Sequence, residues 1–82
     1  MREYDFALGA RAILFFQRVN KRERELLLRS FERLVQDPQQ PPDGILPTRP
    51  REICFKYFSA FRICYWVDHA ECEVRITDIT PK

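Results

Sequence analysis

Apolar and polar residues alternate along the C-terminal part of the chain, from Arg51 to Thr80. A period of two places every second side chain on the same face of a β-strand. The stretch is also rich in the β-branched and aromatic residues that strands favour. Short links between consecutive strands make them antiparallel hairpins. The predicted strands are residues 52–58, 61–67 and 72–79, with turns near Ser59-Ala60 and His69-Ala70.

The same alternation predicts the two faces of this sheet. In the middle strand it separates Arg62 from Ile63 and Tyr65, and in the last strand it puts Asp78 on the face of Ile76. Lys56 and Arg62 are polar residues among the largely apolar residues of the first two strands. We therefore expect one face of the sheet to pack on helices and the other to be at least partly open.

Two amphipathic helices are predicted in the N-terminal half. The first covers Gly9–Val19, with Ala12, Ile13 and Phe16 on one face, and the second covers Lys21–Gln36. Its charged residues have mixed signs and occupy the other faces, which is typical of a solvated surface. The apolar stripe of the second helix consists of Leu27, Phe31, Leu34 and Val35.

Local signals mark the ends of the second helix. Asn20 is a candidate N-cap, and Glu23 three residues later completes a pattern like a capping box. The close junction at Asn20 predicts that the two helices form an antiparallel hairpin. Asp37-Pro38 ends the second helix, because the residue before a proline disfavours the helical region.

A proline-rich connection follows, from Gln39 to Pro50. Its prolines and Gly44 predict an irregular segment, and we expect Ile45 and Leu46 to anchor it to the core. Connections of this length are often functional. Residues 2–7 complete the predicted elements as a short first strand with Tyr4 and Phe6 on one side.

These elements predict an α+β fold in a single domain, residues 1–82. A short N-terminal strand and an α-helical hairpin pack on an antiparallel β-sheet. The chain of 82 residues is long enough for one small core. Its 45% hydrophobic content, with seven Phe, three Tyr and one Trp, excludes a disordered tail.

The arrangement of charge is more informative than its total. The formal net charge is only +2, but residues 49–62 carry Arg49, Arg51, Lys56 and Arg62 against the single acidic residue Glu52. A local positive potential of this kind suits a polyanion or an acidic protein partner.

Cysteine usage and hydropathy indicate a cytoplasmic protein. Cys54, Cys64 and Cys72 are odd in number and form no CxxC pair, and the chain has one His, which argues against a zinc site. We expect free thiols, as in a reducing cytosol. The chain opens without the pattern of a signal peptide, and the apolar run from Ala12 to Phe16 is too short to span a bilayer.

With these elements and residues, the chain resembles the RelE/ParE superfamily of bacterial and archaeal toxin–antitoxin toxins. The order of a short strand, two helices and a hairpin-rich sheet carries part of the likeness. A helix that ends at Leu34-Val35-Gln36-Asp37-Pro38, followed by a loop with Leu46, carries another part. The most specific part is the strand pair Phe-Arg-Ile-Cys-Tyr-Trp-Val-Asp at 61–68 and Val-Arg-Ile-Thr-Asp-Ile at 74–79. The likeness covers nearly the whole chain.

The resemblance implies an mRNA endoribonuclease that needs no metal or other cofactor and acts in the ribosomal decoding site. Arg62 matches the strand arginine of the family, Lys56 lies on the strand where RelE-type members carry lysines, and Lys82 is the cation after the last strand. These three are the candidate catalytic residues. The C-terminal tyrosine of RelE-type enzymes has no counterpart here. The candidate RNA-binding residues are Arg51, Arg49 and Arg75.

Some of these residues, and two others, also have a purely structural interpretation. Arg62 can pair with Asp78 across strands, and Lys56 can be a solvated residue of an edge strand. We expect His69 to be an exposed turn residue, while Trp66 can serve as a stacking platform or be buried under a partner.

The resemblance implies a cognate antitoxin as partner, together with mRNA and the ribosome, and no membrane. One alternative is a ParE-like toxin that is no nuclease and inhibits DNA gyrase. Another is a catalytically impaired member that only binds antitoxin. Outside the family, a small nucleic-acid-binding domain is the remaining alternative.

Overall fold

The computed structural model describes residues 3–82, and the predicted α+β class is confirmed. Both helices and the three hairpin strands lie within two residues of their predicted ranges. The predicted first strand included Arg2, which lies outside the described residues. The elements are β1 (Asp5–Leu8), α1 (Ala10–Arg18), α2 (Lys21–Gln36), β2 (Gly44–Leu46), β3 (Ile53–Phe58), β4 (Phe61–Asp68) and β5 (Glu73–Pro81).

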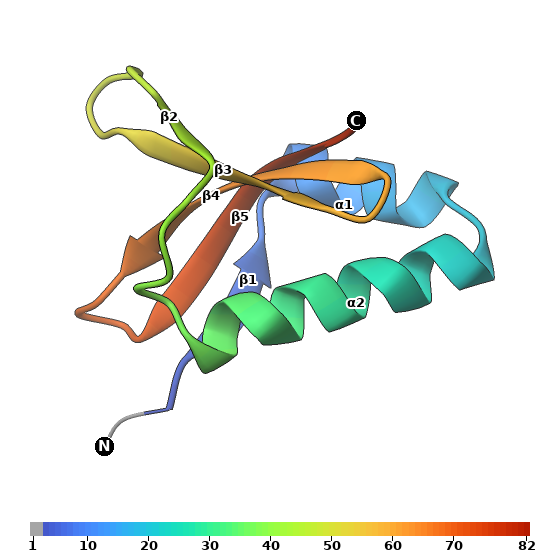
Figure 1. The fold of residues 1–82 in the computed structure, drawn as a ribbon, viewed down its shortest axis with the longest axis horizontal. Coiled ribbons are helices and arrows are strands. Elements are labelled where there is room, and N and C mark those ends of the chain that lie inside the picture. The colour runs from blue at the N-terminus through green and yellow to red at the C-terminus, as the bar shows by residue number, and fades with distance from the viewer. Residues whose placement is uncertain (1–2) are drawn as a thin grey trace.

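The strands form one five-stranded sheet in the order β1-β5-β4-β3-β2 (Figure 1). Strands β2 to β5 pair antiparallel, as predicted. Strand β1 instead lies parallel to β5, with Asp5 opposite Glu73 and Leu8 opposite Ile76. The sheet is therefore mixed: the predicted antiparallel pairing covers β2 to β5, and β1 adds a parallel edge. Both helices and three strands separate β1 from β5 along the chain, so no short turn forces these two strands to be antiparallel.

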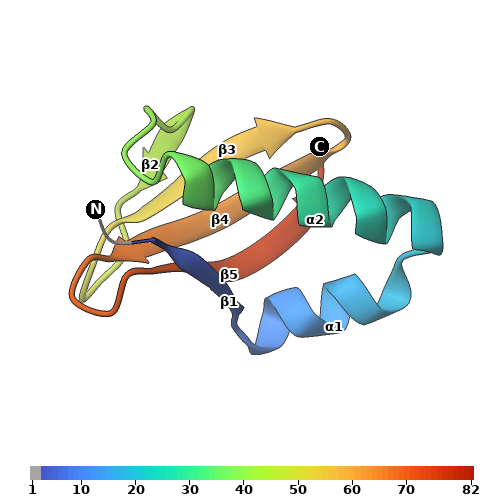
Figure 2. The ribbon, with the colours of Figure 1, turned by 90° about the horizontal axis from the view of Figure 1, so that it is seen from below.

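Helix α2 lies across one face of the sheet (Figure 2). Leu27, Phe31 and Leu34 of its predicted apolar stripe are each 0% exposed, and they pack in one core with Ile63 of β4 and Ile76 of β5. Full burial of a side chain of this size contributes roughly 1.5–3 kcal/mol. This contact accordingly holds α2 to the sheet.

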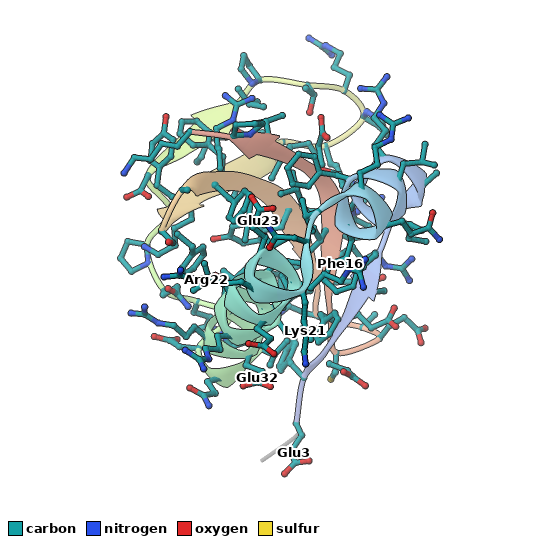
Figure 3. All side chains as sticks on the ribbon, turned by 90° about the vertical axis from the view of Figure 1, so that its right-hand side faces the viewer. Glu3, Phe16, Lys21, Arg22, Glu23 and Glu32 are labelled. Carbon is teal, nitrogen blue, oxygen red and sulfur yellow. The ribbon has the colours of Figure 1, made fainter. Side chains whose placement is uncertain are left out.

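The junction between the helices has the geometry that the sequence predicted. Asn20 Oδ1 accepts a hydrogen bond from the Glu23 N–H at 2.8 Å, and Glu23 Oε1 accepts one from the Asn20 N–H at 3.2 Å. The rings of Phe16 and Phe31 lie 6.2 Å apart and join the two helices. Figure 3 views this end of the molecule, with Phe16 between the helices and Glu32 on the outer side of α2.

The buried face of α1 differs from the prediction at Ile13. Ala12 is 0% exposed, and Phe15 packs edge-on against Phe61 at 5.8 Å between ring centres. Ile13 is 41% exposed, so its assignment to the core is wrong. Helix α1 has only nine residues and lies beside the β5 side of the sheet (Figure 2), so a narrow strip of its surface meets the core.

No helix in the described part of the chain is long and apolar enough to cross a lipid bilayer.

The connection that was predicted to be irregular contains the short strand β2. Gly44 of β2 lies opposite Phe55 of β3, and a Cβ atom at this glycine would overlap the Phe55 ring. Glycine therefore lets the ring lie over the edge strand. Leu46 is partly buried as expected, but Ile45 is 52% exposed and does not anchor the segment.

Strand β5 contains a β-bulge at Thr77. Asp78 pairs with Cys64, whereas Ile76 pairs with the next residue along β4, so Thr77 is an extra residue. The extra residue reverses the alternation in the second half of β5. Ile79 therefore joins Ile76 in the core, and Asp78 turns to the other face. The prediction that Asp78 shares a face with Ile76 is wrong because it assumed strict alternation.

The capping box makes a testable contribution to stability. Replacing Asn20 by Ala removes the acceptor for the Glu23 N–H, and we expect the free energy of unfolding to fall by about 1 kcal/mol. Urea unfolding followed by circular dichroism measures this change. Asn20→Ser keeps a side-chain acceptor and is expected to stay near the parent protein. Equal stability of the Ala and Ser variants would contradict this account.

A candidate nucleic-acid interface on the open sheet face

The sheet has a helix face, which packs against α2, and an open face on the opposite side. Ile63 and Tyr65 are buried in the core on the helix face. Alternation along β4 therefore places Arg62 and Trp66 on the open face, as predicted. Tyr57 lies directly opposite Arg62 in the β3–β4 pair and shares the open face, because cross-strand neighbours point to the same side.

Arg62 is partly buried on the open face. Its guanidinium carbon lies 5.5 Å from the centre of the Phe55 ring, and its Nε is buried without a hydrogen-bond acceptor. The ion pairs within residues 3–82 involve Arg75, so Arg62 does not pair with Asp78. An unsatisfied buried donor costs about 1–3 kcal/mol. A ligand oxygen that reached this N–H would therefore be bound favourably.

Two arginines lie on the same tryptophan ring. The guanidinium carbon of Arg51 is 3.6 Å from the centre of the Trp66 ring, and that of Arg75 is 5.4 Å from it. Arg75 Nη2 also lies 3.0 Å from Glu73, and its Nε lies 3.3 Å from Asp68 without hydrogen-bond alignment. Carboxylates thus neutralise Arg75 in part. Arg51 has no such partner within residues 3–82, and it is the better candidate for binding an anion.

The C-terminal cation also reaches the open face. Lys82 Nζ lies 5.4 Å from the centre of the Tyr57 ring, and the Lys82 backbone N–H donates to Ala60 O at 2.8 Å. Tyr57 is 42% exposed. Because Tyr57 is the cross-strand neighbour of Arg62, Lys82 belongs to the same surface as Arg62.

The structure does not bring Lys56 to Arg62. Lys56 lies opposite Ile63 on the helix face, and its Nζ donates to Pro41 O at 3.1 Å. The β3–β4 register has no bulge that could turn Lys56 to the open face. Arg49 is exposed in the connection between β2 and β3, and within residues 3–82 it makes no hydrogen bond or ion pair.

An open cleft of about 340 Å³ lies where the open face meets the start of α1 and the end of β2. Charged side chains from three elements line it: Arg62 from β4, Asp78 from β5 and Arg11 from α1. Cys64 also lines the cleft. It lies opposite Asp78 in the β4–β5 pair and two residues after Arg62 along β4. The remaining lining residues are Leu46, Thr48, Ile53 and Thr77.

Arg11 and Asp78 are the charged cleft residues that the sequence did not predict as site residues. Arg11 is one of several cations on α1 and α2, so its charge did not distinguish it. Asp78 was assigned to the wrong face because of the bulge at Thr77. Two consecutive polar residues, Thr77-Asp78, break the alternation of β5 and were the signal available in the sequence.

The Cys64 thiol lies within the influence of the Arg62 and Asp78 charges of the cleft. Burial raises the pKa of the Cys64 thiol, the Arg62 guanidinium lowers this pKa, and the Asp78 carboxylate raises it. Both charges therefore act on the same thiol. Burial, with Glu52 nearby, also raises the pKa of Cys54. The three cysteines are free, as expected. Residues 3–82 hold no cluster of three His, Cys, Asp or Glu side chains that could bind a metal ion.

His69 is an exposed turn residue, as predicted, and lies at the other end of β4 from Arg62. Its Nδ1 is 2.7 Å from the hydroxyl oxygen of Tyr4, and the two rings meet edge-on at 5.8 Å. This contact ties the chain before β1 to the β4–β5 turn. His69 is not among the residues that line the cleft.

Comparison with solved structures identifies the fold. The chain superposes on a chain of the RelBE2 toxin–antitoxin complex of Mycobacterium tuberculosis with a TM-score of 0.80 and 14% identity, covering 99% of this chain and 100% of that one. The RelE–RelB complex of Pyrococcus horikoshii gives a TM-score of 0.73 and 15% identity, covering 98% and 96%. The isolated RelE toxin of Escherichia coli gives 0.73 and 18% identity, covering 95% and 83%. The chain therefore has the fold of the RelE toxins.

No family model matches the sequence, and no curated protein matches it at a significant level.

The buried phenol of Tyr65 predicts a pH dependence of stability. Burial raises the pKa of Tyr65 to about 12 from the ordinary value of 10.0. The unfolded chain then loses this proton at lower pH than the folded chain does. The stabilisation is therefore complete below pH 10 and is lost as pH rises towards about 12.

We expect the free energy of unfolding to fall less steeply above about pH 10 in Tyr65→Phe than in the parent protein. Urea unfolding between pH 8 and pH 11, roughly the range in which the effect begins, measures the slope. Tyr57→Phe is the control, because it removes an exposed phenol. Identical slopes for the parent and Tyr65→Phe would contradict the assignment.

Proposed function

We propose that this chain is the toxin of a toxin–antitoxin pair and that it acts in the cytoplasm as a metal-independent endoribonuclease on mRNA. The observation that carries the proposal is the set of cations that lie on aromatic rings across the open face. Arg51 and Arg75 lie on Trp66, Arg62 lies near Phe55, and Lys82 lies near Tyr57. The RelE fold supports the same proposal.

A surface of this kind suits a single-stranded RNA. Bases stack on aromatic rings without regard to sequence, at about 1–3 kcal/mol per base, while cations follow the phosphates. The rings also hold the cations in place before the RNA arrives, through cation–π contacts of roughly 0.5–2 kcal/mol. Tyr57 is exposed enough to stack a base, and Trp66 is partly exposed. Arg49, exposed in the adjacent connection, is proposed to extend this surface.

The proposed chemistry is attack of a ribose 2′-OH on the adjacent phosphorus. This reaction needs stabilisation of the charged phosphorane, a proton donor for the leaving 5′-oxygen and an acceptor for the 2′-OH proton. Arg62 has a donor without an acceptor and is proposed to bind the phosphate. The exposed ammonium of Lys82 is proposed as the proton donor.

The proposed partner is an antitoxin that covers the open face. Two of the similar structures are complexes of a RelE-type toxin with its antitoxin, and another holds an Escherichia coli RelE variant, with two arginines replaced by alanine, bound to a peptide of the antitoxin RelB. An acidic segment would complement the cations on the open face here. The ribosome is proposed as the place where the mRNA is presented.

One observation favours a second candidate function. Because Lys56 lies on the helix face, β3 presents Ile53, Phe55 and Tyr57 to the open face and no cation. A toxin that binds a protein target such as DNA gyrase would need fewer cations there. Growth arrest with intact mRNA and accumulating broken DNA would support this function instead.

The nuclease proposal predicts that two strand cations, Arg62 and Lys56, differ in their effect on cleavage. Arg62→Ala removes the phosphate ligand and is expected to lower mRNA cleavage by about 10²-fold or more. Lys56→Ala removes a cation of the neighbouring strand from the helix face and is expected to leave cleavage near the parent rate. Mapping of 5′ ends on a translated reporter mRNA after induced expression measures both.

Thermal unfolding of both variants separates a loss of activity from a loss of fold. Loss of cleavage in Lys56→Ala but not in Arg62→Ala would overturn the proposed site. Absence of cleavage by the parent protein, with the fold intact, would overturn the nuclease proposal.

RNA binding can be measured separately through the single tryptophan, Trp66. A short single-stranded RNA is expected to change Trp66 fluorescence, with an affinity that falls as salt rises. Arg51→Ala should weaken binding and reduce the slope of log affinity against log salt by about 0.7. Arg33→Ala is the matched control, because Arg33 also lies on an aromatic ring, that of Phe58, but on α2. Equal effects of the two variants would contradict binding on the open face.

A further inference from the structure

We infer that the cleft beside the bulge of β5 binds the scissile phosphodiester of the RNA, with Arg62 and Arg11 as phosphate ligands and Asp78 as the acceptor of the 2′-OH proton. The inference rests on the proposed ribonuclease function and adds two residues to it. It assigns catalytic roles to side chains from three elements that line one cleft.

The bulge at Thr77 is the feature that brings Asp78 into the cleft. If β5 kept Thr77 in regular register, Thr77 would pair with Cys64 and Asp78 would lie opposite Ile63 on the helix face, where an ionised carboxylate is unfavourable. The Thr77 hydroxyl donates to Cys64 O at 3.3 Å and holds the bulge to β4. Bulges are frequent beside active sites, where they turn a side chain towards the reacting group.

Helix α1 begins beside the same bulge and supplies Arg11. The Gly9 N–H donates to Ile76 O at 2.8 Å, and a Cβ atom at Gly9 would lie 3.3 Å from that oxygen and 3.7 Å from the Thr77 Cα. This close approach positions the first turn of α1 at the edge of the cleft. Arg11 and Arg62 therefore face one space from two different elements, an arrangement that suits a phosphate.

The charges in the cleft are not paired with one another. Asp78 Oδ1 accepts a hydrogen bond from the Ile79 N–H at 2.9 Å, and Oδ2 has no protein partner within residues 3–82. Arg62 Nε likewise has no acceptor. The Asp78 and Arg62 side chains thus line the same cleft, and each keeps a polar atom without a protein partner. The charged or titratable groups that line the cleft with Asp78 are Arg62, Arg11 and the Cys64 thiol.

The other carboxylates near the open face have structural partners. Asp68 and Glu73 both contact Arg75. Asp43 accepts a hydrogen bond from the Tyr57 N–H at 2.7 Å. Asp78 is the carboxylate among the residues that line the cleft, and its Oδ2 is available to accept a proton.

The step balances without a metal or a redox partner. The 2′-OH gives its proton to Asp78 Oδ2 as the bond between O2′ and phosphorus forms. The bond between phosphorus and O5′ breaks, and Lys82 gives a proton to the leaving 5′-oxygen. The products are a 2′,3′-cyclic phosphate and a 5′-OH, and solvent returns the proton from Asp78 to Lys82.

The test uses ribosomes programmed with a short mRNA whose cleavage site has first been mapped. Two forms of this RNA are compared, one with the ordinary 5′-oxygen and one with a bridging 5′-sulfur at the cleaved bond. A thiolate leaves without protonation, so the sulfur form bypasses the need for a proton donor but still needs a proton acceptor. The parent protein, Asp78→Asn and Lys82→Ala are measured on both, with Glu71→Gln, in the exposed β4–β5 turn, as a charge-matched control.

We expect Asp78→Asn to lower the cleavage rate constant about 10²-fold or more on both RNAs. Lys82→Ala should be slow on the oxygen form and restored on the sulfur form. Glu71→Gln should match the parent. RNA binding followed by Trp66 fluorescence, and the thermal unfolding midpoint, should be unchanged in Asp78→Asn.

Two results would overturn the inference: cleavage by Asp78→Asn at the parent rate, or restoration of Asp78→Asn by the sulfur form. Arg11→Ala should lower cleavage about 10-fold or more through loss of a charge-assisted contact, whereas Arg18→Ala, at the other end of α1, should not. Equal rates for these two variants would remove Arg11 from the site. Failure of the parent protein to cleave either RNA would overturn the proposed function itself.

Discussion

Burial of the α2 stripe against the centre of the sheet is the interaction on which the rest of the structure depends. Leu27, Phe31 and Leu34 pack against β4 and β5, and this contact decides which side of each strand becomes the core. Since side chains alternate along a strand, burying Ile63 on one face necessarily presents Arg62 on the other. The open face is thus a consequence of core formation. Polar groups gather there because they have no place under α2.

The one interruption of that alternation creates the cleft. The bulge at Thr77 lets β5 keep Ile76 and Ile79 in the core while Asp78 lies between them on the open face. Parallel pairing with β1 ends at Ile76, just before the bulge, and α1 begins at the same place. Edge pairing, helix start and bulge therefore coincide, and each limits where the others can lie.

Aromatic rings organise the cations of the open face. A free arginine side chain loses roughly 1.5–2 kcal/mol of rotamer entropy when a ligand orders it. Contact with a ring restricts the side chain beforehand, as for Arg51 on Trp66 at 3.6 Å, and leaves the N–H groups at the ring edge available. Arg75 shows the limit of this effect, since its carboxylate partners leave it less able to bind a further anion.

The sequence by itself determined both helices and the three hairpin strands, but not β2, because their signals are local: the period of two in the hairpin strands, the stripe of α2 and the capping box at Asn20. It also placed Arg62 on the open face, since the middle strand alternates regularly from Phe61 to Val67. The tertiary structure alone decided the parallel edge of β1, the helix-face position of Lys56 and the open-face position of Asp78. Strand partners far apart in the chain, and a single extra residue in one of them, set these features. A break in alternation such as Thr77-Asp78 can mark a bulge, but it does not encode which strands pair or in what register.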